Sequence, residues 1–432
     1  MAGSPRIQTE SKWPTDEIDE SELRSLNRGF YVILAAQFFS SLGDNTLLFG
    51  AIALLRELQA PPWQTPVLQQ FFIFAYIVLA PFVGPFTDAL PKGQVMLISN
   101  TVKTFACAAM LAGMHPLIAY GFVGLGAALY SPAKYGILTE YFPPRRLVWA
   151  NGWMEGLTVA AIILGAIVGG MFIGDRVGGF LAGRLAEVPF DIGTPPRFTV
   201  AAVFGFYLIA ALFNLYVPKL PIDHTLPKRA PWYLLQDFRQ CFKQLWQDPL
   251  GQVSLAVTSL FWGTGTVLRL LILLWAAQAL DLNLEQATQL TAVVAVGIAI
   301  GAGLAKDVPL DRCVRVLPVG VAMGFTVAGM VLVTDWRVAL PLLALIGAMG
   351  GYFVVPMNAL LQHRGHLLMG AGHSIALQNF NENLTVLLML GLYTLMIRAE
   401  LAVDTMVVTF GILVAASMAV LTKIHGNGRH GE

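Results

Sequence analysis

The stretch Glu155-Gly156-Leu157-Thr158-Val159 occurs a second time, with one substitution, as Glu382-Asn383-Leu384-Thr385-Val386. Other landmarks recur at nearly the same spacing: Gly43 and Thr46 match Gly263 and Thr266, and Pro132 matches Pro356. The spacing grows slowly from one matched pair to the next, as between two diverged copies that differ by small insertions. Chance similarity among small residues is the alternative, and three landmarks in equivalent positions argue against it. The repeats predict that the chain is a tandem duplication of one unit.

Both copies are built from segments that are long and apolar enough to cross a membrane. Apolar residues make up 56% of the 432-residue chain and charged residues 12%, against about 25% charged residues in soluble domains. This composition excludes a water-soluble globule. A crossing helix needs about 20 mostly apolar residues, and the sequence predicts an all-α integral membrane protein with twelve transmembrane helices in two pseudo-symmetric six-helix bundles. The twelve windows lie near 29–55, 67–90, 94–114, 116–139, 149–174, 198–218, 250–280, 287–305, 314–334, 338–361, 371–397 and 401–423.

The basic residues predict the orientation of the chain in the membrane. Lys and Arg outside the spans concentrate on the side of the N-terminus, and the positive-inside rule places that side, with both termini, in the cytoplasm. Trp232 and Phe238 lie among basic residues in the longest polar segment, which leaves two alternatives: an amphipathic helix on the membrane surface or a solvated linker. The expected organisation is a flexible tail at 1–28, an N-terminal bundle at 29–218, a cytoplasmic linker at 219–248, a C-terminal bundle at 249–424 and a tail at 425–432.

Charge and motifs exclude several classes of function. A formal net charge of +1 provides no basic face for nucleic acid, which we do not expect as a partner. The cysteines Cys107, Cys241 and Cys313 are too far apart for a zinc motif or a disulfide framework. The chain contains neither a GxxxxGK[ST] nucleotide loop nor an HExxH zinc motif. We therefore expect no enzyme activity, no metal and no cofactor.

Several ionisable residues lie inside the predicted spans, where each costs at least about 2.5–3.5 kcal/mol unless it faces a partner or a wet cavity. Asp44 lies near the midplane of the first span, Arg269 in the outer half of the seventh and Lys134 in the cytoplasmic third of the fourth. One acid and two bases at different depths suit a headgroup that carries both an amine and a phosphate. Arginine is the better phosphate ligand, because its planar guanidinium donates two parallel hydrogen bonds. The alternative is a structural ion pair of Asp44 with Lys134 or Arg269.

Further polar residues lie in the fifth, eleventh and third spans. Glu155 is close to the inner end of its span, which indicates a place in a cytoplasmic gate. Glu382 and its neighbours either hydrogen-bond helices together or line the substrate cavity. Lys103, about nine residues into the third span, is interpreted as a lysine whose ammonium extends to the membrane surface. The polar neighbours of Glu382 are Gln378, Asn379, Asn381 and Asn383.

The segment Gly84-Pro85-Phe86-Thr87-Asp88, followed by Lys92-Gly93, resembles the inner-loop signature of the major facilitator superfamily. That resemblance implies the fold of the superfamily. It also implies that Asp88 accepts hydrogen bonds from a helix N-terminus across the interface of the two halves and holds the inner side shut. The superfamily usually has a basic residue directly after the Asp, whereas Ala89 stands here and Lys92 comes later. Asp88 and Lys92 join Glu155 as candidate gating residues, and a plain surface turn is the alternative.

Five motifs together resemble the bacterial lysophospholipid transporter family. They are 43–49 (GDNTLLF), 80–84 (APFVG), 130–138 (YSPAKYGIL), 260–263 (LFWG) with Leu268-Arg269, and 350–362 (GGYFVVPMNALLQ), and the likeness runs from about residue 30 to 424. The resemblance implies a flippase of the bacterial inner membrane that moves lysophosphatidylethanolamine and related lysophospholipids from the outer to the inner leaflet. It maps the polar site residues of the family onto Asp44, Asn45, Lys134 and Arg269. With the polar residues described above, the candidate substrate ligands are Asp44, Asn45, Lys134, Arg269, Asn358, Gln378 and Glu382.

The same resemblance implies the partners of the protein. Its lysophospholipid substrate would be re-acylated by a cytoplasmic acyltransferase paired with an acyl-carrier-protein synthetase. Because the chain ends nine residues after Lys423, we expect this partner to be a separate protein. We expect a monomer surrounded by membrane lipids. The alternative function is a proton-coupled drug exporter in which Asp44 or Glu382 titrates, whereas a non-transporting scaffold would leave the intramembrane charges without a role.

Overall fold

The computed structural model describes residues 20–61, 64–174, 180, 184, 192–218, 231–282 and 284–426, and the regular elements in these ranges are helices. The N-terminal half contains α1 (Glu20–Glu57), α2 (Gln64–Asp88), α3 (Lys92–Leu111), α4 (Pro116–Tyr141), η1 (Pro144–Arg146), α5 (Leu147–Ile173) and α7 (Pro195–Leu215). The helix α8 (Pro231–Gln247) follows. The C-terminal half contains α9 (Pro249–Ala279), α10 (Leu284–Ala305), η3 (Leu310–Val316), α11 (Leu317–Ala328), η4 (Gly329–Leu332), α12 (Trp336–Met369), α13 (Ala371–Arg398) and α14 (Val403–Gly426).

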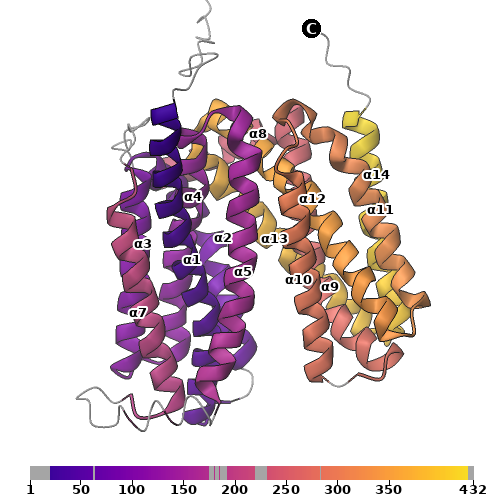
Figure 1. Ribbon diagram of the computed structural model, residues 1–432, viewed down its shortest axis with the longest axis horizontal. Helices are drawn as coiled ribbons and strands as arrows, with labels where there is room; N and C mark the ends of the chain where they lie inside the picture. The colour runs from indigo at the N-terminus through magenta and orange to yellow at the C-terminus, as the bar shows by residue number, and fades with distance from the viewer. Residues whose placement is uncertain are drawn as a thin grey trace, which may run out of the picture.

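The long helices form two bundles side by side (Figure 1). In the first, α1 packs on α5 and α7, and α3 packs on α4 and α7. In the second, α10 packs on α12, α11 on α14 and α9 on α13. The bundles meet where α2 packs on α13 and α5 packs on α10. The repeated Glu-x-Leu-Thr-Val stretch lies in α5 and in α13, so these two most extensive contacts between the bundles are equivalent under the internal repeat.

The helices agree closely with the predicted spans. Within the described residues, eleven helices are long and apolar enough to cross a membrane, and the described apolar part of α10, Gln289–Ala305, is shorter. The helix α1 begins at Glu20, inside the tail expected at 1–28, and residues 1–19 lie outside the described part. The tail expected at 425–432 lies outside the described residues from 427 onward, and the linker expected at 219–248 lies outside them up to residue 230.

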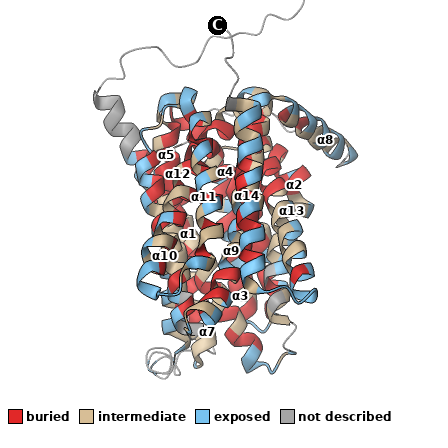
Figure 2. Ribbon diagram, turned by 90° about the vertical axis from the view of Figure 1, so that its right-hand side faces the viewer, coloured by how far each residue is buried: buried red, intermediate tan, exposed pale blue. Residues whose placement is uncertain are grey.

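Large apolar side chains cover the outer surface of the bundles. Phe105 on α3 is 62% exposed, Leu212 on α7 58% and Leu388 on α13 64%, and Figure 2 shows exposed positions along the surface of many helices. An exposed apolar surface of this extent is not stable in water. The surrounding solvent of these helices is therefore the hydrocarbon of a membrane.

Proline and polar caps determine where several helices begin. Asp248 precedes Pro249 at the start of α9, and its Oδ2 accepts the backbone N–H of Gly251 at 2.8 Å. Asp335 caps α12 in the same manner, accepting the N–H of Arg337 at 2.8 Å. A carboxylate at this position binds N–H groups that have no partner within the helix, and proline fits the first helical turn because it lacks an N–H. The polar connections between spans are thus also the start signals of the helices.

The linker contains a helix that packs on the bundle. Cys241 and Leu245 on α8 are buried in a cluster with Leu255, Leu361 and Leu377 of the C-terminal half, whereas Trp232 at the start of α8 is 69% exposed. The linker thus contains a helix with an apolar side that packs on the C-terminal half, and its contact with a membrane surface stays a prediction. We call the end of the molecule at which α1 begins, α14 ends and α8 lies the α8 end, and the opposite end the far end (Figure 1).

Glycines allow the two halves to approach closely at the α8 end. A Cβ on Gly84 of α2 would lie 2.9 Å from the Cα of His373 on α13. A Cβ on Gly152 of α5 would lie 3.1 Å from the carbonyl oxygen of Ala302 on α10. Side chains at these positions would hold the backbones apart, so the absence of a side chain is what closes this end of the interface.

Candidate functional site

Asp44 forms an ion pair inside the N-terminal half. The Nζ of Lys103 lies 2.8 Å from each carboxylate oxygen of Asp44, and the Tyr207 hydroxyl donates to Oδ1 at 2.8 Å. The Lys103 side chain is 1% exposed and that of Asp44 21%. The pair joins α1, α3 and α7, and only its acidic member is accessible from outside the protein.

The interpretation of Lys103 as a lysine that extends to the membrane surface is wrong. Lys103 lies eleven residues from the first and eight from the last residue of α3 (Lys92–Leu111), about 16 and 12 Å from the two ends of the helix at 1.5 Å per residue, which is too deep for a lysine side chain to reach either surface. Its ammonium also donates to Ser40 at 3.1 Å and lies 5.2 Å from the ring centroid of Tyr130 and 5.4 Å from that of Tyr207. The cost of burying a charge, applied to Lys103 as it was to Asp44, would have indicated that Lys103 needs a partner.

The other two candidate bases do not pair with Asp44. Lys134 on α4 is 8% exposed, its Nζ lies 4.4 Å from the ring centroid of Tyr135, and no carboxylate of the described residues lies within 4.0 Å of it. Arg269 on α9 is exposed and likewise forms no ion pair with a described residue. The alternative in which Asp44 pairs with Lys134 or Arg269 is therefore wrong, and neither base is paired with a carboxylate of the described residues.

Asn45 lies next to Asp44 on α1 but faces α5. Its Nδ2 donates to the carbonyl oxygen of Ser41 at 2.8 Å within the same helix. A Cβ on Gly165 of α5 would lie 2.6 Å from the Cβ of Asn45. Asn45 is half-buried, and its oxygen remains able to accept a hydrogen bond from a ligand.

Four of the candidate residues form one chain of hydrogen bonds across the two halves. Glu155 on α5 accepts from the Tyr135 hydroxyl at 2.6 Å and from Nδ2 of Asn358 on α12 at 3.3 Å. Gln378 on α13 donates to Asn358 at 2.9 Å and to Glu382 at 2.7 Å. All four candidates are buried. The polar cluster around Glu382 thus bonds helices together in this structure, and a role of these residues in lining the substrate cavity stays a prediction.

Two more pairs of polar side chains connect the halves. Asn151 on α5 and Gln362 on α12 exchange two hydrogen bonds, at 2.8 and 2.7 Å. Ser131 on α4 and Asn379 on α13 lie 3.0–3.2 Å apart. Asn151, Ser131 and Gln362 were not among the predicted site residues, because a single buried amide or hydroxyl in a sequence gives no signal of its partner.

The segment around Asp88 connects the halves at the α8 end. Asp88 accepts the backbone N–H groups of Gly372 at 2.6 Å and His373 at 3.0 Å, at the N-terminus of α13. Lys92 lies 3.0 Å from Asp88 and 3.1 Å from Glu140. Lys92, four residues after Asp88, therefore supplies the positive charge that the superfamily pattern has at the position of Ala89.

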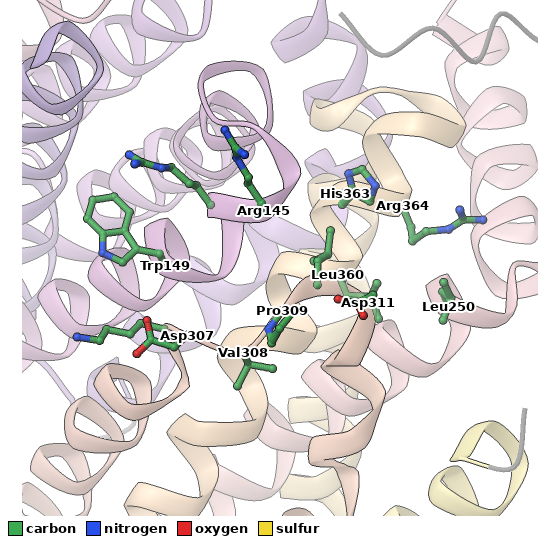
Figure 3. Close-up of a pocket in the computed structure, with 13 residues that line it drawn as sticks. Arg145, Trp149, Leu250, Asp307, Val308, Pro309, Asp311, Leu360, His363 and Arg364 are labelled. Atoms are coloured by element: carbon green, nitrogen blue, oxygen red, sulfur yellow. The ribbon is translucent and has the colours of Figure 1, made fainter. Parts of the chain in front are cut away.

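A pocket of about 960 Å³ also lies between the halves, at the α8 end. Figure 3 shows Arg145 and Trp149 on one side of it and His363 and Arg364 on the other. Arg364 is paired with Asp248. The residues around Asp44 lie elsewhere, so this pocket is separate from the candidate substrate site.

Comparisons with known proteins agree with this architecture. The family model for the Major Facilitator Superfamily matches residues 33–384. The fold is similar to that of a transporter of this superfamily, FucP, in its outward conformation, with a TM-score of 0.72 at 12% identity over 93% of this chain and 99% of FucP. It is also similar to a bacterial homologue of the iron transporter ferroportin, with a TM-score of 0.67 at 16% identity over 92% of this chain and 100% of the homologue.

Much higher identity links the chain to curated relatives. The protein named lysophospholipid transporter LplT of Serratia proteamaculans is 43% identical over 375 residues, which is 86% of this chain and 89% of the relative. The protein of the same name from Yersinia enterocolitica is 43% identical over 376 residues, 86% of this chain and 88% of the relative. The identity extends over both bundles, and the chain belongs to the lysophospholipid transporter family of the major facilitator superfamily.

Proposed function

We propose that this protein transports lysophospholipids, lysophosphatidylethanolamine among them, from the outer to the inner leaflet of the bacterial inner membrane by alternating access. The observation that carries the proposal is the ion pair of Asp44 with Lys103, in a chain whose 43% identical relatives bear the name of lysophospholipid transporters. A pair of opposite charges at mid-depth, with its acid partly accessible, is suited to a substrate headgroup that is itself a pair of opposite charges.

Headgroup binding adds a second pair of opposite charges beside the first. The substrate amine binds Asp44, the accessible member of the pair, while Lys103 keeps its contact with the carboxylate. The zwitterionic headgroup has no net charge, so its binding adds none at membrane depth. Arg269, exposed on α9 and free of carboxylates among the described residues, binds the phosphate from the opposite half. Lys134 is the next base on the route toward the α8 end, and Asn45 is an additional hydrogen-bond acceptor.

The contacts between the halves suggest the direction of access. Asp88, Asn151, Ser131 and Glu155 all bond to the C-terminal half, and they lie on the parts of their helices nearer the α8 end. We place the α8 end in the cytoplasm, because the flanking basic residues concentrate on this side. In this orientation the structure is closed toward the cytoplasm, and a headgroup reaches Asp44 from the outer leaflet.

The same orientation supports the remaining expectations. Both termini lie in the cytoplasm, and lysophospholipid delivered to the inner leaflet becomes available to a separate acyltransferase paired with an acyl-carrier-protein synthetase. The acyl chain of the substrate remains in the lipid between the halves, so the protein encloses the headgroup alone. The transporting unit is a monomer.

The test is uptake of headgroup-labelled lysophosphatidylethanolamine by spheroplasts that lack other routes. Asp44→Asn and Arg269→Gln are expected to abolish uptake, while Arg398→Gln, which changes another exposed arginine of the C-terminal half, leaves uptake unchanged. Membrane levels of each variant are measured in parallel. Uptake by the intact protein no greater than by empty membranes, together with proton-gradient-dependent efflux of organic cations, would refute the proposal in favour of a drug exporter.

A further inference from the structure

One histidine at the α8 end lies between two carboxylates from different parts of the chain. The Nδ1 of His373 on α13 lies 2.6 Å from Oδ2 of Asp88 on α2, and its Nε2 lies 3.1 Å from Oδ2 of Asp237 on α8. The imidazole is 15% exposed, Asp88 3% and Asp237 28%. One side chain thus connects both halves of the transporter with the linker helix.

The geometry determines how many protons this site holds. An ionised carboxylate can only accept hydrogen bonds, and a neutral imidazole has one donor nitrogen. With both ring nitrogens at hydrogen-bond distance from a carboxylate oxygen, a neutral ring would direct a lone pair at one of the two carboxylates. The contacts therefore require one additional proton, carried by the imidazole as imidazolium. If the carboxyl of Asp237 carried this proton in place of the imidazole, the proton would still lie between Asp237 and His373, and the cluster would hold the same number of protons.

The surrounding charges favour this proton. The cluster around His373 contains three carboxylates: Asp88 on α2, Asp237 on α8 and Glu140 on α4. It also contains the ammonium of Lys92 on α3, which lies 3.0 Å from Asp88 and 3.1 Å from Glu140. Three negative charges against one positive charge leave a net charge of −2, which the imidazolium reduces to −1. On the adjacent α12, Arg364 is paired with Asp248, and on α13 itself Glu382 is nine residues further along the helix.

We propose that His373 is a proton-binding site that clamps the linker helix α8 to the contact between the halves, so that binding of one proton stabilises the closed state of the α8 end. Opening this end separates α2 from α13 and removes Asp88 from His373. The open state therefore binds the proton more weakly than the closed state does. By linkage, a proton that binds the closed state more strongly shifts the equilibrium toward that state.

Other contacts keep the α8 end closed when the proton is absent. Asp88 still accepts the N–H groups of Gly372 and His373 and still pairs with Lys92. Loss of the proton therefore weakens the closed state without abolishing it. The ratio of closed to open molecules is expected to fall as the pH rises, by up to about tenfold per pH unit for a single proton.

The experiment measures this ratio on the full-length protein in lipid nanodiscs, without substrate. Spin labels are attached to Arg145→Cys on the N-terminal half and Lys306→Cys on the C-terminal half, two exposed positions that line the same pocket in the closed state. The native cysteines are buried, so labelling is directed to these positions. The distance distribution between the labels is recorded from pH 5.5 to 8.5, and its short component reports the closed state.

The expected result is a short component that decreases as the pH rises. His373→Gln removes this dependence, whereas His363→Gln, which changes another histidine at the same end, retains it. Asp237→Asn keeps an acceptor for Nε2 but removes the charge, so the transition moves to lower pH. A distribution independent of pH in the unsubstituted protein, or a wild-type dependence in His373→Gln, would overturn the proposal. If His373→Gln does not fold, an unchanged transition in Asp237→Asn overturns it. Because no substrate is present, either result is independent of the proposed transport function.

Discussion

Replacing Lys103 by methionine removes the ammonium that neutralises Asp44 while nearly keeping the volume of the side chain. Asp44 loses two charge-assisted hydrogen bonds of 2.8 Å and keeps the one from Tyr207. Removing one partner of a buried ion pair costs about 3–5 kcal/mol. Asp44 is 21% exposed and can recruit water. The free energy of unfolding lost in Lys103→Met is therefore expected at the lower end of this range, about 3 kcal/mol.

The complementary substitution is expected to cost more. Asp44→Asn leaves the ammonium of Lys103 without a counter-ion, and this side chain is only 1% exposed. Its cost is therefore expected at the upper end, about 5 kcal/mol. The double variant Asp44→Asn/Lys103→Met contains no charge at this position and is expected to recover most of the loss, although it should not transport.

The assay is the free energy of unfolding in mixed micelles, measured by titration with a denaturing detergent. Ser40→Ala is the matched control, because it removes one hydrogen bond from the Lys103 ammonium and one to Asn100 while it leaves the ion pair with Asp44 in place. Single hydrogen bonds between membrane helices contribute about 0.6 kcal/mol on average, a fraction of the effect expected for the ion pair. Single variants as stable as the unsubstituted protein, or a double variant that loses the sum of both single effects, would refute the assignment of Asp44 and Lys103 as a coupled pair.

Three further predictions concern the α8 end. Gly84→Ala is expected to open this end, because the added Cβ would lie 2.9 Å from the Cα of His373. The spin-label distance between positions 145 and 306 should lengthen in Gly84→Ala and stay unchanged in the control Gly156→Ala, whose Cβ meets nothing within 4 Å. A short distance in Gly84→Ala would contradict the role of this contact. Asn151→Ala leaves the buried amide of Gln362 without its partner, at a cost of about 1–3 kcal/mol to the closed state. The fraction of closed molecules should fall in the same spin-label measurement. An unaltered fraction would show that this amide pair does not stabilise closure. Asp248→Asn tests the cap of α9: burial alone would raise the pKa of Asp248, but hydrogen bonds from Arg364 and from the N–H of Gly251 lower it below its ordinary value. The stability that Asp248 contributes is therefore fully present above about pH 3.9, the ordinary carboxyl value, and is lost as the pH falls through the lower pKa of the folded state. The difference in melting temperature between Asp248→Asn and the unsubstituted protein should accordingly be large at pH 7 and shrink in acid, and a difference that grows in acid would contradict this sign.

Local properties of the sequence determined the architecture. The length of each apolar window is set by the thickness of the membrane, so the helices could be located without knowledge of their neighbours. The Glu-x-Leu-Thr-Val repeat identified α5 and α13 as equivalent, and the loop around Asp88 indicated a hydrogen bond to a helix N-terminus, which the backbone N–H groups of Gly372 and His373 provide. The depth of Asp44 in its span was sufficient to mark it as a residue that needs a partner.

Only the tertiary structure decided which partner each polar residue has. The cost of burying Asp44 shows that a counter-charge exists, but Lys103, Lys134 and Arg269 all satisfied that requirement in the sequence. The choice depends on the rotation of each helix about its own axis and on which helices are neighbours, and neither is encoded in hydropathy along the chain. The same reason applies to Asn151 with Gln362 and to His373 with Asp237. These pairs join segments more than a hundred residues apart, and they exist because the two bundles and α8 meet at one end of the molecule.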